Sequence, residues 1–148
     1  MEHAMNECQS GFIAGDTSCR GRILLVDDES DIRKGVCLSL RNAGYEILEA
    51  ESVEGAIQII NEGENRLVLD VVICDIRMPK THGIEAIAYF RSYYPRVPLV
   101  VLTGFPDLEM AISLFHQGVV DYLVKPVGSK QLRTTVLRAM EQGELARL

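Results

Sequence analysis

The sequence predicts an α/β protein made of five βα units, (βα)5, around a parallel five-stranded sheet. Short apolar runs alternate with longer segments in which apolar residues recur at helical spacing, a pattern typical of βαβ units. Residues that favour helix starts and helix ends stand between them. The chain has 148 residues, of which 47% are apolar and 24% charged, so it is long enough for one globular domain with its own core.

Five apolar runs are the predicted strands. Several consist almost wholly of Val, Ile and Leu, as expected for strands that helices cover on both faces of a sheet. The runs occupy residues 23–26, 45–50, 71–74, 99–102 and 119–124.

Five helices are predicted from apolar stripes that follow these runs. Each stripe has i, i+3, i+4 spacing and is expected to face the sheet. The stripes are Ile32, Val36 and Leu40; Val53, Ala56, Ile57 and Ile60; Ile84, Ile87 and Ala88; Leu108, Ala111, Ile112 and Phe115; and Leu132, Val136, Ala139 and Met140. The predicted caps are Ser30, Ser52, Asp107 and Ser129 at helix starts, and Gly44, Gly63, Gly118 and Gly143 at helix ends.

One domain accounts for most of the chain. Residues 1–21 lack periodicity and are rich in small and polar residues, so they are expected to form a mobile arm. Residues 22–143 carry all five βα units, and residues 144–148 are expected to be a short tail. This organisation predicts no room for an output domain within the chain.

Composition excludes several classes of function. A formal net charge of −6 argues against direct binding to nucleic acid or to anionic membranes. The four cysteines lack zinc-site spacing, and Cys74 is predicted to pack within a strand rather than to act in redox chemistry. No stretch approaches the ~18 apolar residues of a membrane span, and no export signal stands at the N-terminus. These features predict a cytoplasmic protein.

Polar residues with related chemistry end four of the predicted strands. They are Asp27 and Asp28, Asp75, Thr103 and Lys125. The carboxyl ends of parallel strands meet at one edge of a sheet, where ligands bind. Three neighbouring carboxylates need a cation or a neighbouring lysine, and hard oxygen ligands suit Mg²⁺. Asp75, central in the sheet, is the candidate nucleophile toward a phosphoryl group, with Asp27 and Asp28 holding Mg²⁺, Lys125 offsetting charge and the Thr103 hydroxyl donating to a phosphoryl oxygen.

Four motifs in order resemble the receiver domain of bacterial two-component response regulators. They are ILLVDDE (23–29), VVICDIRMP (71–79), VVLTG (100–104) and DYLVKP (121–126), and the resemblance covers residues 21–143. It implies a flavodoxin-like fold, a three-layer sandwich with strand order 2-1-3-4-5. Because no effector domain is evident, the chain is most similar to stand-alone, chemotaxis-regulator-like receivers.

The resemblance also implies a signalling function. Asp75 would accept phosphate from a histidine kinase or a histidine phosphotransfer protein. Mg²⁺ would be held by Asp28, Asp75 and the backbone carbonyl of Arg77, with Asp27 acting through water. The only catalysis implied is self-phosphorylation and slow autodephosphorylation.

Conformational switching is implied by the same resemblance. Thr103 and Tyr122 match the family's switch pair, which changes the surface of the fourth helix, fifth strand and fifth helix. A downstream protein would read that surface, and the same surface would support a phosphorylation-linked homodimer. The Lys125-Pro126 bond is expected to be cis, and Arg77 and Phe105 occupy positions that tune how long the phosphate lasts.

Three other interpretations compete with this one. A haloacid-dehalogenase-type phosphohydrolase would want an acid two residues after the nucleophile, where this chain has Arg77. A nucleotide-binding protein would carry GxGxxG or GxxxxGK[ST] after the first strand, and neither is present. The third is a receiver fragment of a longer transcriptional regulator, since the last helix could continue into a linker.

Overall fold

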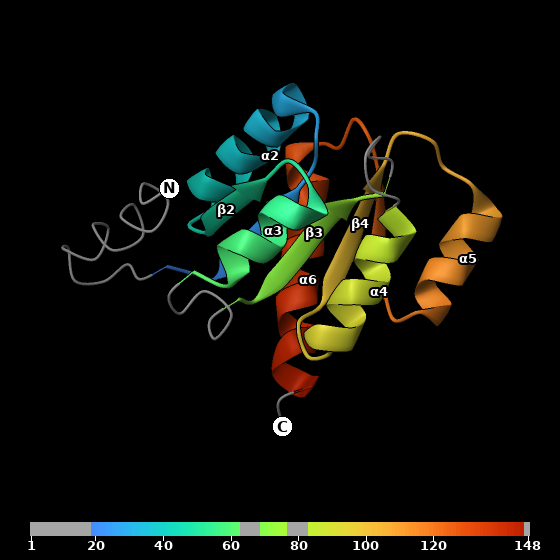
Figure 1. The fold of residues 1–148 in the computed structure, drawn as a ribbon. Coiled ribbons are helices and arrows are strands. Elements are labelled where there is room, and N and C mark those ends of the chain that lie inside the picture. The colour runs from blue at the N-terminus through green and yellow to red at the C-terminus, as the bar shows by residue number, and fades with distance from the viewer. Residues whose placement is uncertain (1–18, 63–68, 77–82, 147–148) are drawn as a thin grey trace.

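The computed structural model describes residues 19–62, 69–76 and 83–146. The described chain alternates five strands with five helices (Figure 1). They are β1 (Arg22–Val26), α2 (Ser30–Asn42), β2 (Glu46–Ala50), α3 (Val53–Ile60), β3 (Val71–Asp75), α4 (Gly83–Tyr93), β4 (Leu99–Thr103), α5 (Leu108–His116), β5 (Asp121–Val124) and α6 (Ser129–Ala146).

The sheet confirms the predicted order. All strand pairs are parallel, and the order is β2-β1-β3-β4-β5. Val26 of β1 lies opposite Cys74 of β3, so Asp27 and Asp75 follow at the same level. Thr103 lies opposite Val124, which places Lys125 one step beyond. The register therefore brings the polar strand ends to one edge, as the strand-end rule predicts.

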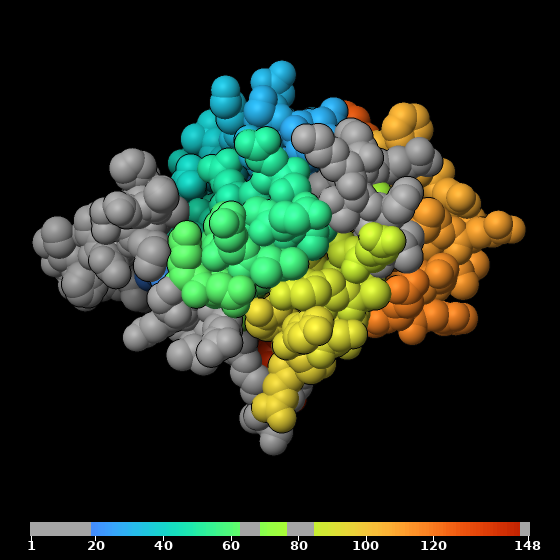
Figure 2. Space-filling model, viewed as in Figure 1, coloured from blue at the N-terminus to red at the C-terminus, as the bar shows by residue number. Residues whose placement is uncertain are grey.

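Two apolar layers hold the helices on the sheet. One layer packs α2 and α6 against it through buried residues such as Leu40 and Val136. The other packs α3 and α4 against the opposite face through residues such as Ile60 and Phe90. Figure 2 views the second layer, with α3 and α4 covering the sheet and α5 beside α4. This confirms the three-layer α/β sandwich.

Helix α5 differs from the prediction. Its stripe was expected to face the sheet, yet the side chains of Leu108, Ile112 and Phe115 are 75%, 49% and 47% exposed. The helix instead buries Leu114, with Met110 partly buried against the same layer. Met110 and Leu114 are four residues apart and take the sheet-facing side of the helix, which leaves the predicted stripe on the opposite, solvent-facing side.

The helix caps are confirmed in part. Ser52 and Asp107 accept hydrogen bonds from the amides of Gly55 and Glu109. Gly44 and Gly118 have φ of +101° and +99°, the left-handed conformation that ends a helix at low cost.

Three cap predictions are wrong. Glu29, not Ser30, is the N-cap of α2, and Ser129 is already the first residue of α6. Gly143 lies inside α6, where a Cβ would come within 3.1 Å of Pro98, so the close approach of the helix to Pro98 accounts for a glycine there. The Gly63 prediction lies outside the described residues.

Chain ends and other local features complete the fold. The predicted arm lies largely outside the described residues, but the Arg20 amide donates to Gly44 O and Gly21 O accepts from the Glu46 amide. Helix α6 continues through Ala146 rather than ending before residue 144. The Lys125-Pro126 peptide bond is cis. Within the described ranges, no helix combines the length and apolar character needed to cross a bilayer.

Candidate functional site

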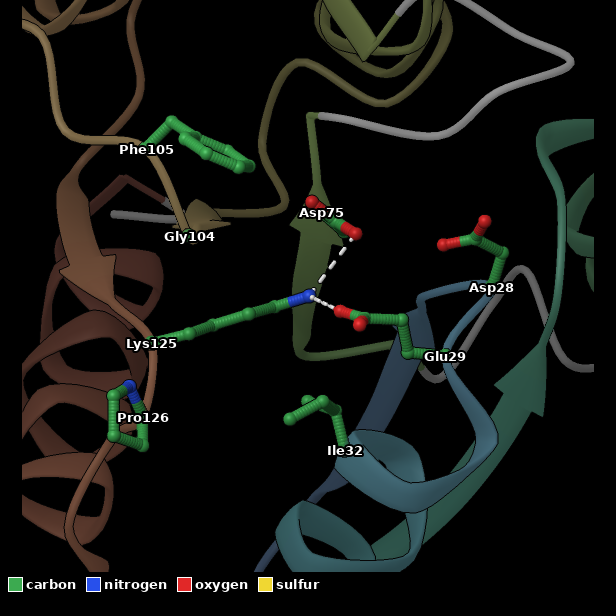
Figure 3. Close-up of a pocket in the computed structure, with 8 residues that line it drawn as sticks. All are labelled: Asp28, Glu29, Ile32, Asp75, Gly104, Phe105, Lys125 and Pro126. Carbon is green, nitrogen blue, oxygen red and sulfur yellow. Dashed lines mark hydrogen bonds and ion pairs between the residues drawn. The ribbon is translucent and has the colours of Figure 1, made fainter.

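The carboxyl edge of the sheet holds a solvent-open pocket of about 450 Å³. Figure 3 shows its lining, with Asp75 and Lys125 at the centre and Asp28 and Glu29 on the opposite wall. Ile32 of α2, Gly104 and Phe105 after β4, and Pro126 after β5 complete the wall.

Three carboxylates form the acidic side of the pocket. Oxygen atoms of Asp27, Asp28 and Asp75 all lie within 4.8 Å of one another. Asp27 is fully buried and Asp75 is 2% exposed, while Asp28 is half-buried. Burial raises the pKa of the Asp27 carboxyl, against the opposing effect of the Glu29 amide that donates to it at 2.9 Å. Each carboxylate therefore needs compensating positive charge.

Lys125 supplies part of that charge. Its Nζ lies 2.7 Å from Glu29 Oε1, 2.9 Å from Asp27 Oδ2 and 3.1 Å from Asp75 Oδ2. Burial by itself lowers the pKa of Lys125, but the Glu29, Asp27 and Asp75 carboxylates that pair with the ammonium outweigh this effect and raise the pKa. Lys125 is thus a permanent ammonium beside Asp75.

The donor set fits a hard divalent cation. Among the residues that the structure describes, four carboxylates, counting Glu29, gather around one ammonium, so these groups carry an excess of negative charge. Carboxylate oxygens at this spacing are the ligands that Mg²⁺ prefers. Asp27, Asp28 and Asp75 are the residues that would hold the ion, and the Arg77 carbonyl predicted to join them lies outside the described residues.

Thr103 and Tyr122, the predicted switch pair, are not among the residues that line the pocket, and both hydroxyls are hydrogen-bonded to backbone groups. The buried Thr103 hydroxyl accepts from the Phe105 amide at 3.0 Å and donates to Phe105 O at 3.3 Å. Tyr122 packs against the second apolar layer, and its hydroxyl accepts from the Asp107 amide at 3.0 Å. Tyr122 therefore contacts the backbone where α5 begins.

Cys74 precedes Asp75 in β3 and is buried. Burial raises the pKa of Cys74, and the Asp75 and Asp27 carboxylates raise it further. Its sulfur packs in the second apolar layer while the Asp75 carboxylate faces the pocket. This agrees with the prediction that Cys74 has a packing role.

Glu29 was missed by the sequence analysis. It is the third acid of the Asp27-Asp28-Glu29 run, and acids before a helix are commonly explained by the helix dipole. Its side chain makes no capping hydrogen bond and instead reaches Lys125. The sequence did contain one signal for this role. Glutamate stands at the N-cap position of α2, where Ser, Thr, Asp or Asn is preferred.

Comparison with known proteins decides the family. The model of the response regulator receiver domain family matches residues 23–137. This chain belongs to the receiver-domain family. The family-matched segment carries the aspartates, the threonine and the lysine of the pocket.

Curated relatives of this receiver domain are larger regulators. The regulatory protein AtoC of Escherichia coli is 32% identical over 120 residues, covering 81% of this chain and 25% of AtoC. The alginate biosynthesis transcriptional regulatory protein AlgB of Pseudomonas aeruginosa is 35% identical over 126 residues, covering 85% of this chain and 27% of AlgB. The chain thus spans about a quarter of the length of these relatives.

Solved receiver structures share the fold. A receiver domain from Clostridium thermocellum is 34% identical with a TM-score of 0.77, covering 84% of this chain and 98% of that one. The beryllofluoride-activated NtrC4 receiver domain dimer is 26% identical with a TM-score of 0.75, covering 82% and 98%. The flavodoxin-like receiver fold is therefore confirmed.

Proposed function

We propose that this receiver domain is a phosphorylation-dependent switch in a two-component system, with Asp75 as the phosphoacceptor. The observation that carries the proposal is the position of Asp75. It is almost wholly buried, lines an open pocket, touches the Lys125 ammonium and shares the pocket with two further carboxylates. A carboxylate held beside fixed positive charge suits attack on an anionic phosphoryl group.

The proposed reaction transfers a phosphoryl group from a phosphohistidine of a sensor kinase or phosphotransfer protein. An Asp75 carboxylate oxygen forms a bond to phosphorus while the phosphorus–nitrogen bond breaks, and the imidazole leaves with the electron pair and takes up a proton. Water later attacks phosphorus, which releases inorganic phosphate and restores the carboxylate. Mg²⁺, held by Asp27, Asp28 and Asp75, would neutralise charge on the phosphoryl oxygens.

The proposed switch runs from Thr103 to α5. The Thr103 hydroxyl would have to break its hydrogen bonds with the Phe105 backbone in order to donate to a phosphoryl oxygen. Loss of these bonds would release the start of the β4–α5 loop, to which Phe105 belongs. Tyr122 is bonded to the amide of Asp107, the N-cap of α5. A change in that loop therefore reaches the start of α5 through direct contacts.

The apolar face of α5 supports a protein partner as the reader. Leu108, Ile112 and Phe115 expose about half or more of their side chains, and Phe105 beside the pocket is 64% exposed. Neighbouring exposed apolar side chains of this kind mark interaction sites. The surface formed by α5, β5 and α6 is accordingly the proposed docking face for a downstream protein or a second copy of the chain.

A second candidate concerns the whole protein. The curated relatives include transcriptional regulatory proteins about four times the length of the matched segment. This favours a role as the receiver part of a transcriptional regulator, alongside the stand-alone role. In both cases the chain would not act as an enzyme beyond its own phosphorylation and dephosphorylation, in the cytoplasm.

The proposal is tested by intact-mass spectrometry after incubation with acetyl phosphate and Mg²⁺. We expect a single phosphate adduct in the wild type, loss of the adduct in Asp75→Asn, and its retention in Asp31→Asn, which removes an exposed acid from the first turn of α2. Labelling of Asp75→Asn equal to wild type would contradict the proposal. Rapid turnover of p-nitrophenyl phosphate would instead favour the phosphohydrolase interpretation.

A further inference from the structure

The Lys125 ammonium is surrounded by three carboxylates: it donates hydrogen bonds to Glu29 Oε1 and Asp75 Oδ2 and forms an ion pair with Asp27 Oδ2. An ammonium has three donors, and three carboxylates lie within 3.1 Å of Nζ. Figure 3 shows the ammonium between Asp75 and Glu29. A phosphoryl donor that enters the pocket while Asp75 is still a carboxylate must therefore compete with these carboxylates for the Lys125 ammonium.

The three partners differ in how firmly they are held. Asp27 and Asp75 are 0% and 2% exposed, so separating either from the ammonium leaves a buried charge without its counterion. The Glu29 side chain is 59% exposed, and water replaces the ammonium readily there. Glu29 is therefore the partner that leaves at least cost.

The backbone around Glu29 points to the same use of its side chain. Glu29 is the N-cap of α2, with extended φ and ψ of −89° and 109°, but its carboxylate bonds no amide of the helix. Its own amide donates to Asp27 Oδ1 at 2.9 Å, and its carbonyl accepts from the Arg33 amide at 3.0 Å. The backbone is fixed by these bonds, which leaves the side chain directed at Lys125.

We infer that Glu29 is a positioning residue. In the resting state its carboxylate accepts a hydrogen bond from the Lys125 ammonium, and the incoming phosphoryl group takes its place. The inference rests on the proposed role of Asp75. Glu29 thus acts as an internal anionic competitor, which sets how readily the pocket accepts phosphoryl groups. It acts through Lys125 and takes no bond to the reacting atoms.

The test uses Glu29→Gln, with Glu51→Gln as the matched control. Glu51 is an exposed acid that follows β2 at the same edge of the sheet. In Glu29→Gln, the half-saturating concentration of beryllofluoride in Mg²⁺ is expected to fall about threefold to fivefold, and the initial rate of phosphorylation by acetyl phosphate is expected to rise by the same factor. In that reaction the Asp75 oxygen bonds phosphorus as the bond to acetate breaks and acetate leaves. Glu51→Gln should match the wild type.

Glu29→Asp separates the contact from the charge. Aspartate keeps the negative charge but is one methylene shorter, and it is also a preferred helix cap. If Glu29 acts through its contact with Lys125, Glu29→Asp resembles Glu29→Gln in beryllofluoride binding while its melting temperature stays equal or rises. If only negative charge at the pocket mouth matters, Glu29→Asp resembles the wild type and the inference is wrong.

Two further outcomes are decisive. Equal rates and equal beryllofluoride affinity in wild type and Glu29→Gln, or slower labelling in Glu29→Gln, would overturn the inference while leaving Asp75 as the acceptor. Absence of any Asp75-dependent adduct in the wild type would instead overturn the proposed function.

Discussion

Lys125 Nζ lies 3.1 Å from Asp75 Oδ2, so the residue after β5 is joined to the last residue of β3 across the end of β4. The same ammonium pairs with the fully buried Asp27 after β1. One cation therefore holds together three of the five strand ends. This arrangement couples the chemistry of the pocket to the stability of the sheet edge.

Replacing Lys125 by Met should destabilise the protein. Asp27 and Asp75 would lose their counterion while remaining almost wholly buried. Breaking a fully buried pair costs roughly 3–5 kcal/mol, and we expect about 2 kcal/mol here because the pocket opens to solvent. Urea unfolding without divalent ions measures the change, with Lys130→Met on the exposed first turn of α6 as the control. Equal unfolding free energies for wild type and Lys125→Met would contradict this account.

Magnesium should stabilise the wild type. The ion offsets the excess negative charge that Asp27, Asp28 and Asp75 place in the pocket. A ligand at about ten times its Kd adds roughly 1.4 kcal/mol, which raises the melting temperature by about 3–5 °C for a domain of this size. Calorimetry with and without MgCl2 measures the shift.

The matched variants are Asp28→Asn and Asp31→Asn. The first removes a pocket carboxylate and should lose most of the shift, while the second removes an exposed acid of α2 and should keep it. A full magnesium shift in Asp28→Asn would place the ion elsewhere on the surface.

Much of the fold and site followed from local sequence signals. Apolar runs predict the strands, and the strand-end rule places Asp27, Asp28, Asp75 and Lys125 at one edge of the sheet from the sequence alone. Such predictions succeed where the backbone alone determines position. The strand order itself came from the family resemblance.

The failures have a common physical origin. The apolar stripe of α5 has the same spacing as a stripe that packs in a core. Periodicity alone does not show whether such a stripe faces the sheet or the solvent. The Glu29 contact depends on where the Lys125 side chain ends, 96 residues away in the chain. Both features are set by tertiary packing, which no short window of sequence contains.

Tyr122→Phe should loosen the start of α5. The substitution removes the hydroxyl that accepts from the Asp107 amide and leaves the ring packing intact. We expect an unfolding free energy lower by about 0.5–1 kcal/mol and faster hydrogen exchange at the first turn of α5. Hydrogen exchange with mass spectrometry measures the second effect. Tyr93→Phe, on an exposed ring of α4, is the control, and equal exchange in the two variants would show that the bond does not hold the helix.

Stability should fall at alkaline pH because of Cys37. Burial, and then the neighbouring Glu49 carboxylate, raise the pKa of Cys37 from 9.0 to about 12. The folded state therefore keeps a proton that the unfolded chain loses, so this contribution is complete below pH 9 and is lost as the pH rises from 9 toward 12. At pH 10 the loss is on the order of 1 kcal/mol.

Cys37→Ala isolates that contribution. The variant is less stable at neutral pH because it leaves a cavity, but its unfolding free energy should decline less steeply between about pH 9 and 10.5. Urea unfolding at a series of pH values under reducing conditions measures both slopes. Val36→Ala, which opens a cavity on the same buried face of α2 without removing a titratable group, should keep the wild-type slope. Parallel pH profiles for wild type and Cys37→Ala would mean that the Cys37 thiol ionises as readily in the folded protein as in the unfolded chain, contrary to its burial on the inner face of α2.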